Sequence, residues 1–146
     1  MSTIDRVRAA TNDTVNRQID QETARRVRAF EDRDAAAIDR RIAELEREWD
    51  IERVLELNAS VLALSGVALA ALHHRRWLLL PGIVLTFLFQ HAVQGWCPPI
   101  ELFRRIGIRT RKEIDRERYA LKALRGDFDQ AVRSRAAGDA LSAVDV

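Results

Sequence analysis

The single cysteine, Cys97, is the residue of this 146-residue chain best suited to chemistry on its own. It lies in the stretch Gly-Trp-Cys-Pro-Pro and precedes Arg104 and Arg105 by roughly two helical turns. Neighbouring cations lower the pKa of a thiol and favour the reactive thiolate. The pattern therefore allows a redox or sulfur-relay role for Cys97, and the alternative interpretation is packing as a small apolar group.

A second set of polar side chains interrupts two apolar runs. Thr86, Gln90 and Gln94 recur every fourth position and so share one helical face, next to His91, the only titratable group of its run. Asn58 lies at a similar depth in the preceding run. Amides in hydrocarbon need partners, so we expect Asn58, Gln90 and Gln94 to meet across a helix interface. A polar lining for a ligand or a proton is the sharper alternative.

Other reaction types lack their residues. The chain has no glycine-rich phosphate loop, no His-Glu-x-x-His, no Cys-x-x-Cys and no serine in a nucleophile turn. The adjacent His73 and His74 have no cysteine or acidic residue beside them, which is poor evidence for a metal site. We therefore predict no enzyme, no cofactor and no metal.

The polar side chains lie in or beside two uncharged runs. The first, Leu57–Leu72, has sixteen residues, and the second, Trp77–Phe89, has thirteen. A bilayer is about 30 Å of hydrocarbon, or about 20 helical residues, and flanking residues lengthen each run to that size. Trp77 and Trp96 are about 28 Å apart along a helix, the spacing of two aromatic belts. We predict an all-helical membrane protein with two antiparallel transmembrane helices, and a buried hairpin in a soluble core is the alternative.

Small residues in the first span predict how its helix packs. Small residues fall at steps of four, three and four in the first span, and they form a stripe along which helices approach closely: Ala59, Ala63, Gly66 and Ala70.

The basic residues near the span ends predict the orientation. They number eight on the tail side and two in the loop, so both termini are expected in the cytoplasm. The interface anchors are predicted to be Trp77, Trp96, Arg104 and Arg105. The polar N-terminus predicts no cleavable signal peptide.

A change of structure is expected after the second span. Gly95 loosens that helix, Cys97 ends it, and Pro98-Pro99 cannot continue its hydrogen bonds. The apolar residues from Ile100 to Ile106 predict a short helix in the headgroup layer, stopped by Gly107. Thr110 to Glu113 form a capping box that should start a helix running from Arg111 to about Gly126.

The same stretch resembles a known family. Gly95-Trp96-Cys97-Pro98 and Gly107-Ile108-Arg109-Thr110, preceded by Ile51-Glu52-Arg53, are similar to the YgaP-like transmembrane domain family over roughly residues 50 to 112. The resemblance implies a bacterial inner-membrane hairpin that dimerises, found alone or behind a rhodanese sulfurtransferase. No rhodanese domain is encoded here, so the resemblance implies no catalysis.

The N-terminal segment reads as helix. Residues 1–56 hold no proline or glycine, with 11 bases and 14 acids, and a break is possible around Thr11 to Thr14. A heptad seam recurs at steps of four, three, four and three: Ile38, Ile42, Leu45, Trp49 and Glu52. Such a seam predicts a coiled coil with a second copy or a partner. Interleaved charges of both signs argue against nucleic-acid binding.

The sequence thus divides into four parts: a charged amphipathic arm (1–50), a two-span hairpin with an interfacial helix (51–107), a cytoplasmic helix (108–128) and a flexible tail (129–146). We predict a structural or interaction protein of the bacterial inner membrane. Its hairpin would anchor it in the lipid bilayer and form homo-oligomers, and its cytoplasmic helices would bind a protein partner. The redox role of Cys97 stays as the alternative function.

Overall fold

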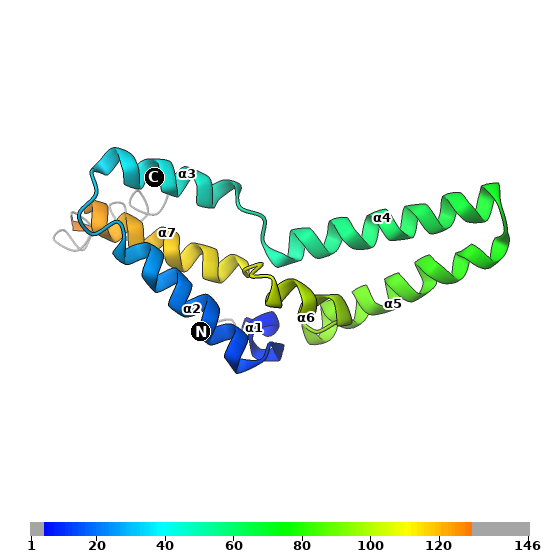
Figure 1. The fold of residues 1–146 in the computed structure, drawn as a ribbon. Coiled ribbons are helices and arrows are strands. Elements are labelled where there is room, and N and C mark those ends of the chain that lie inside the picture. The colour runs from blue at the N-terminus through cyan, green and yellow to red at the C-terminus, as the bar shows by residue number, and fades with distance from the viewer. Residues whose placement is uncertain (1–4, 130–146) are drawn as a thin grey trace. The chain divides into compact units, whose positions relative to one another are not determined.

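A computed structural model describes residues 5–129 of the chain, which form helices and no strands (Figure 1). The chain divides into two compact units. Unit 1 comprises Met1–Ile19 and Trp49–Lys112, and unit 2 comprises Asp20–Glu48 and Glu113–Val146. Almost all of the tail predicted at 129–146 lies outside the described residues. Each unit therefore combines an early and a late part of the sequence, which differs from the four consecutive parts that the sequence predicts.

The described residues hold seven α-helices and one 3-10 helix. In chain order they are α1 (Arg6–Ala10), α2 (Asp13–Arg28), α3 (Ala35–Arg47), α4 (Ile51–Leu72), the 3-10 helix η1 (Arg75–Leu78), α5 (Leu79–Gln94), α6 (Pro98–Arg105) and α7 (Arg111–Arg125). Helix α7 confirms the helix predicted from the capping box at Thr110.

Aspartates divide the predicted N-terminal arm into separate helices. Asp5, Asp34 and Asp50 are the N-caps of α1, α3 and α4, and the side chain of each accepts a hydrogen bond from the backbone N–H three residues later. The break predicted around Thr11 to Thr14 is confirmed, because α1 ends at Ala10 and α2 begins at Asp13. The sequence reading missed the break between α2 and α3. An aspartate that satisfies a free N–H stabilises a helix start at its own position.

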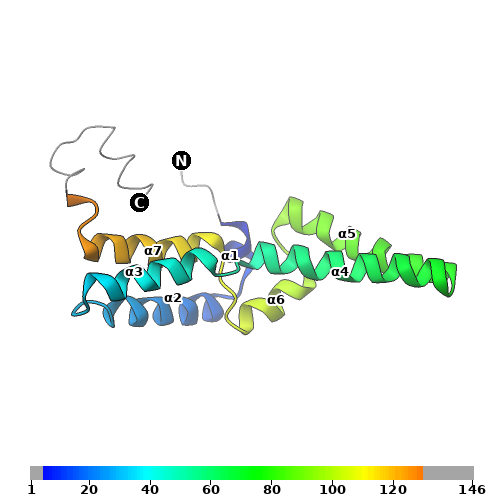
Figure 2. The same cartoon turned by 90° about the horizontal axis from the view of Figure 1, so that it is seen from above.

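The two apolar helices of unit 1, α4 and α5, run side by side in opposite directions (Figures 1 and 2). Gly66 allows the close approach near the turn. A Cβ placed on this residue would lie 2.5 Å from Cδ of Pro81 and 3.2 Å from the carbonyl oxygen of Trp77. Ala59 and Gly66 are buried, and Ala63 and Ala70 are partly buried. The small-residue stripe is therefore used within one chain, between α4 and the segment that follows it.

The end of α5 corrects one prediction. The helix ends at Gln94, and Gly95 caps it in the left-handed conformation with φ of 76°. Cys97 is instead the N-cap of α6, whose first two residues are Pro98 and Pro99. Proline suits a first helical turn because its missing N–H would have no partner there. The two prolines thus start a helix and do not merely stop the preceding one.

Unit 2 holds the heptad residues of α3 in its own core. Ile38, Ile42 and Leu45 are buried with Ile114 and Leu121 of α7. Helices α2, α3 and α7 lie side by side in Figures 1 and 2. The prediction of a coiled coil with another molecule along these three residues is therefore wrong, because α7 of the same chain already covers them. The seam also stops at Leu45, since α3 ends at Arg47 before Trp49 is reached.

Candidate functional site

The candidate site is the junction of α4, α5 and α6 in unit 1, where Cys97 lies. Only 1% of the Cys97 surface is exposed. It belongs to a core cluster with Val7 of α1, Ile51 and Leu55 of α4, and Ile100 of α6. The thiol therefore packs as one of the apolar groups that hold these helices together.

The environment of Cys97 does not activate it. Burial of the thiol raises its pKa, and this effect exceeds that of the backbone hydrogen bond from Ile100, which lowers it. The sequence allowed the opposite direction, because Arg104 and Arg105 follow in the next turns. That expectation is wrong, since desolvation disfavours the thiolate and the Arg104 guanidinium is occupied elsewhere.

Arg104 and Arg105, predicted together as interface anchors, have different surroundings. Arg104 is 1% exposed, and its Nη2 donates to Oδ1 of Asn16 at 2.9 Å while Nη1 donates to the carbonyl oxygen of Ile108 at 3.2 Å. The side chain of Arg105 is 71% exposed. Arg105 can reach headgroups, whereas Arg104 holds α6 to the start of α2. The other two predicted anchors, Trp77 and Trp96, are both exposed.

The segment Gly107 to Thr110 joins several parts of unit 1. Gly107 has φ of 90°, which favours glycine, and Ile51 N–H donates to the carbonyl oxygen of Arg109 at 2.9 Å. The Thr110 hydroxyl donates to the carboxylate of Asp5 at 2.5 Å. The segment Gly107–Thr110, which carries part of the family resemblance, therefore has a structural role here.

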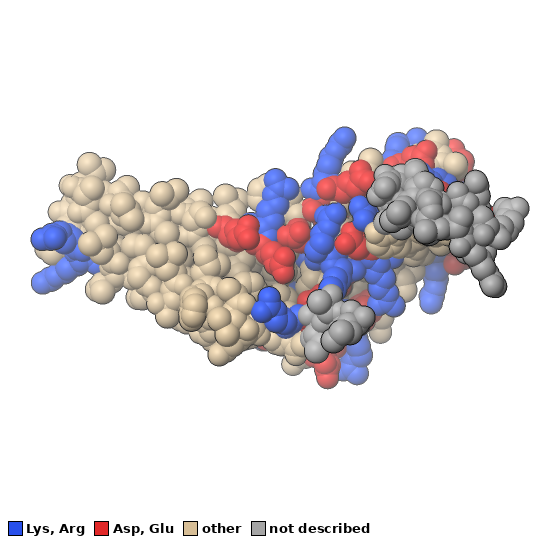
Figure 3. Space-filling view, turned by 180° about the vertical axis from the view of Figure 1, so that it is seen from behind, with Lys and Arg blue, Asp and Glu red and all other residues tan. Residues whose placement is uncertain are grey.

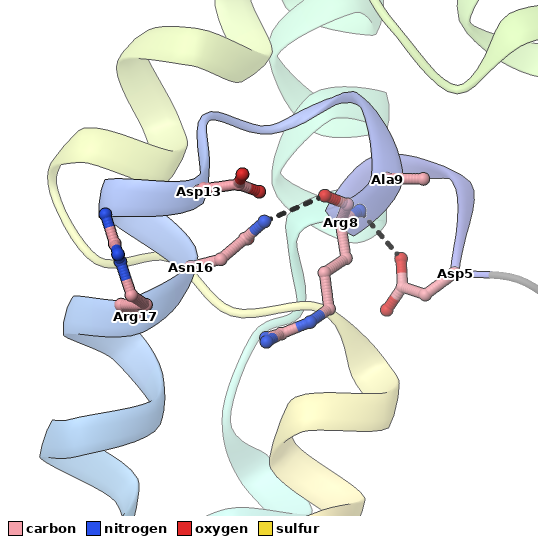
Figure 4. Close-up of a pocket in the computed structure, with 6 residues that line it drawn as sticks. All are labelled: Asp5, Arg8, Ala9, Asp13, Asn16 and Arg17. Atoms are coloured by element: carbon pink, nitrogen blue, oxygen red, sulfur yellow. Dashed lines mark hydrogen bonds between the residues drawn. The ribbon is translucent and has the colours of Figure 1, made fainter.

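A polar surface pocket lies beside α1 and the start of α2, with a volume of about 500 Å³ (Figure 4). Its walls include Asp5, Arg8, Asp13, Asn16 and Arg17. Asn16 Nδ2 donates to the carbonyl oxygen of Arg8 at 3.0 Å, and the Arg8 N–H donates to Asp5 at 3.0 Å. These bonds link the pocket residues to one another and fix the turn between the two helices.

The predicted meeting of amides between the two apolar helices does not form. Gln90 Nε2 lies 3.5 Å from Oε1 of Gln94, so these two residues of α5 contact each other along one helix. The Thr86 hydroxyl donates to the carbonyl oxygen of Gly82 at 2.8 Å. Asn58 lies on α4 in a separate groove. Thr86, Gln90 and Gln94 share one face of α5, but Asn58 lines a groove that contains none of these three residues.

His91 is partly buried near the end of α5. Its Nδ1 atom is buried and has no hydrogen-bond partner within residues 5–129. Two backbone carbonyl oxygens near the ring already accept hydrogen bonds. The Gly95 N–H donates to the carbonyl oxygen of His91, and Nη1 of Arg6 donates to the carbonyl oxygen of Ala92. In the part of the chain that the structure describes, no acid is hydrogen-bonded to the His91 ring to form a proton relay.

An apolar groove of about 200 Å³, here called the seam groove, opens between α4, α5 and α6. Its walls include residues of all three elements: Asn58 and Leu62 of α4, Val84 and Phe87 of α5, and Cys97 and Pro98 at the start of α6. This groove is not predictable from the sequence. Asn58 and Cys97 are both candidate residues, but they are 39 positions apart, and no local pattern places them on one cavity.

The histidines of the turn have a local structural role. His74 is the N-cap of η1, and its Nδ1 accepts a hydrogen bond from Arg76 N–H at 3.0 Å. Within residues 5–129, no cluster of three or more histidine, cysteine or acidic side chains could hold a metal ion.

Comparison of the chain with known proteins finds no relative. No family model, no curated protein and no solved structure matches the chain. The resemblance to the YgaP-like family therefore stays a prediction from residues 50 to 112, and the functional argument depends on the geometry of the two units.

Proposed function

We propose that the chain is a membrane-anchored interaction protein, in which α4 and α5 form a transmembrane hairpin and unit 2 binds a protein partner. The single observation that carries the anchor is the exposure of the apolar helices. The stretches Ala35–Leu72, whose apolar part is α4, and Arg75–Gln94 are long and apolar enough to cross a membrane. Only 17% and 6% of their apolar windows are buried, whereas a core helix of a soluble protein would be mostly buried.

The exposed side chains belong on a lipid-facing surface. Large apolar residues of both helices are exposed along their length: Leu57, Val61, Leu64, Val67, Leu72, Leu79, Ile83, Leu85, Phe89 and Val93. On the face seen in Figure 3, the hairpin surface is free of charge between the start of α4 and the tip, where the turn carries Arg75 and Arg76. An apolar surface of this extent is unfavourable in water and favourable in hydrocarbon.

The proposed orientation places the turn outside and both termini in the cytoplasm of a bacterium. It is supported by the bases of the sequence, which are fewer at the turn, with Arg75 and Arg76, than around the other ends of the spans. Helix α6 would then lie at the cytoplasmic surface. Leu102 and Ile106 are exposed at and just after its last turn and would enter the headgroup layer.

Unit 2 is the proposed partner-binding part. It has its own core, and a surface pocket of about 250 Å³ between α2 and α7 has Val27, Ala24 and Ala120 in its walls. The pair Arg116–Asp20, 3.1 Å apart, borders the pocket. An apolar patch bordered by charged groups is compatible with the apolar core and polar rim of a protein interface.

Self-association stays part of the proposal but needs a different surface from the one first predicted. The small-residue stripe and the heptad seam are both covered within the chain. The outward faces of α4 and α5 remain for contacts between copies. A redox or sulfur-relay function, the alternative, is not favoured, because the Cys97 thiol is buried and its pKa is raised.

Alkaline carbonate extraction of membranes from expressing cells tests the anchor. We expect the chain in the membrane pellet. A double variant, Val67→Asp with Ile83→Asp, should shift to the soluble or degraded fraction, because each mid-span charge costs about 2.5–3.5 kcal/mol. Leu102→Asp on α6 is the matched control and should stay in the pellet. Recovery of the unmodified chain as a soluble species without detergent would contradict the proposal.

Single cysteines test the orientation. In a Cys97→Ser background, Arg75→Cys should react with a membrane-impermeant maleimide in cells with a permeable outer membrane. Arg105→Cys should react only after the inner membrane is opened. The reverse order would place the termini outside.

A further inference from the structure

We propose that the seam groove binds one acyl chain of a membrane glycerophospholipid, with the Asn58 side chain donating a hydrogen bond to the ester carbonyl of that chain. The inference rests on the proposed membrane anchor. It names a ligand class for a cavity that neither packing nor the anchor explains.

The shape and chemistry of the groove fit a single hydrocarbon chain. Its volume of about 200 Å³ is smaller than the roughly 300 Å³ at which pockets for drug-sized ligands begin. From Leu55 to Leu62 it follows seven residues of α4, or about 10 Å of helix. The walls are apolar except for Asn58 and the Cys97 thiol. A polar ligand would lose its hydrogen bonds to water in such a groove.

The groove opens onto the surface proposed to face lipid. Leu62 and Phe87 line the groove and are also 39% and 38% exposed. A lipid chain beside α4 and α5 can therefore enter sideways without crossing a polar region. No segment of the chain within residues 5–129 fills this opening.

The Asn58 side chain indicates a lipid as the occupant, because its amide has no hydrogen-bond partner within residues 5–129. Within residues 5–129 its side chain makes no hydrogen bond, whereas Gln90 and Gln94 contact each other. Asn58 is partly buried, and a ligand that brings an acceptor into the groove would give its amide a hydrogen bond that the apolar walls do not supply.

The depth of Asn58 matches the ester carbonyls of a glycerophospholipid. Asn58 lies two residues beyond Glu56, the last charged residue before the apolar part of α4, and so about 3 Å deeper along the helix. Ester carbonyls lie at that boundary between the headgroups and the hydrocarbon. A lipid bound by its carbonyl at Asn58 would extend its chain along Leu62 toward Val84 and Phe87.

Photo-crosslinking of the full chain tests the proposal. The protein is reconstituted in phosphatidylethanolamine–phosphatidylglycerol vesicles that contain phosphatidylcholine with a diazirine on one acyl chain. Mass spectrometry then locates the adducts. We expect them to concentrate on the groove residues Leu62, Val84 and Phe87, in excess over the outward residues Leu64 and Ile83, which are 70% and 56% exposed.

Two variants and one control separate a groove from general lipid contact. Leu62→Trp fills the groove and should abolish the excess, whereas Leu64→Trp on the outer face of α4 should preserve it. Asn58→Leu keeps the size of the side chain but removes the donor, so the excess should fall about two- to tenfold. Helical circular dichroism confirms that each variant is folded.

The outcomes distinguish this inference from the anchor. Adducts spread evenly over groove and outward residues would overturn it, as would an excess unchanged in both Leu62→Trp and Asn58→Leu. An absence of lipid adducts on Leu62, Val84 and Phe87, with adducts present on the outward residues, would assign the groove to another occupant and also overturn it. Carbonate extraction of the same vesicles shows in each case whether the anchor itself holds.

Discussion

The guanidinium of Arg41 holds the carboxylate of Glu117 from two atoms, with Nε at 3.0 Å and Nη2 at 2.8 Å from Oε1. Nη1 of Arg26 lies 3.6 Å from the other oxygen, and the Glu117 side chain has no exposed surface. Arg41, Glu117 and Arg26 come from α3, α7 and α2, so one ion cluster around a buried carboxylate joins all three helices of unit 2. The carboxylate of Glu117 is the fully buried member, since the side chains of Arg41 and Arg26 are 20% and 36% exposed.

We therefore expect Glu117→Gln to destabilise unit 2 by about 1.5–3 kcal/mol, because Arg41 and Arg26 lose the charge of their buried partner and keep only Glu44 and Glu22. Denaturant unfolding of the full chain in detergent, followed by circular dichroism, measures the change. Glu44→Gln is the matched control. Glu44 also contacts Arg41, but its side chain is 64% exposed, so its loss should cost less than about 1 kcal/mol. Equal effects of the two variants would contradict the buried cluster.

Gly66 should be the most sensitive glycine of the hairpin. Gly66→Ala places a methyl group against the ring of Pro81, and the strain of overpacking, about 1–3 kcal/mol, should exceed the gain in helix propensity. Gly82→Ala is the control, because a Cβ there meets nothing within 4 Å. It should be neutral or stabilising. Thermal unfolding in detergent compares the two, and a stable Gly66→Ala protein would mean that α4 and α5 are not in this contact.

Cys97 should be a slow thiol in the folded protein. Alkylation by iodoacetamide at neutral pH should be slower by roughly tenfold or more than for Arg105→Cys in a Cys97→Ser chain, because burial blocks access and reduces the thiolate fraction. Denaturant should remove the difference. Reaction of native Cys97 as fast as the exposed control would restore the redox alternative.

The raised pKa of Cys97 also predicts a dependence of stability on pH. The unfolded thiol ionises first, near its ordinary pKa of about 8.5, while the folded thiol stays protonated to higher pH. The contribution of the protonated thiol is complete below that value and is lost as the pH rises through the folded pKa. Cys97→Ala should remove this alkaline decline, as measured by unfolding between neutral and alkaline pH.

Arg104 and Arg105 offer a neighbouring pair with opposite expectations. Arg104→Met leaves the Asn16 amide oxygen and the Ile108 carbonyl without their buried donor, so we expect a loss of about 1.5–3 kcal/mol. Arg105→Met removes an exposed side chain whose contact with Glu101 is 3.7 Å long, and should change stability by less than about 0.5 kcal/mol. Unfolding of the two variants under the same conditions decides between them, and similar losses would mean that Arg104 is not buried.

Much of the secondary structure could be predicted from local signals. The capping box at Thr110 and Glu113 placed α7, and the uncharged runs placed α4 and α5, because each signal acts through neighbours along the chain. The caps at Asp34 and Asp50 were available by the same rule, but the absence of proline and glycine favoured one continuous arm. A single aspartate can end that continuity, since it satisfies a backbone N–H only at a helix start.

The sequence by itself determined the helices and their apolar faces, since helical periodicity and uncharged length are properties of consecutive residues. Only the tertiary structure decided what covers those faces. The stripe at Gly66 meets Pro81, and the seam at Ile38 and Leu45 meets α7, where the sequence allowed a second copy. The partner of an apolar face depends on which distant segment packs against it in the folded chain. Cys97 is a second example. The arginines that follow it in the sequence allowed a reactive thiol, but burial against Val7 and Ile51 raises the pKa of that thiol.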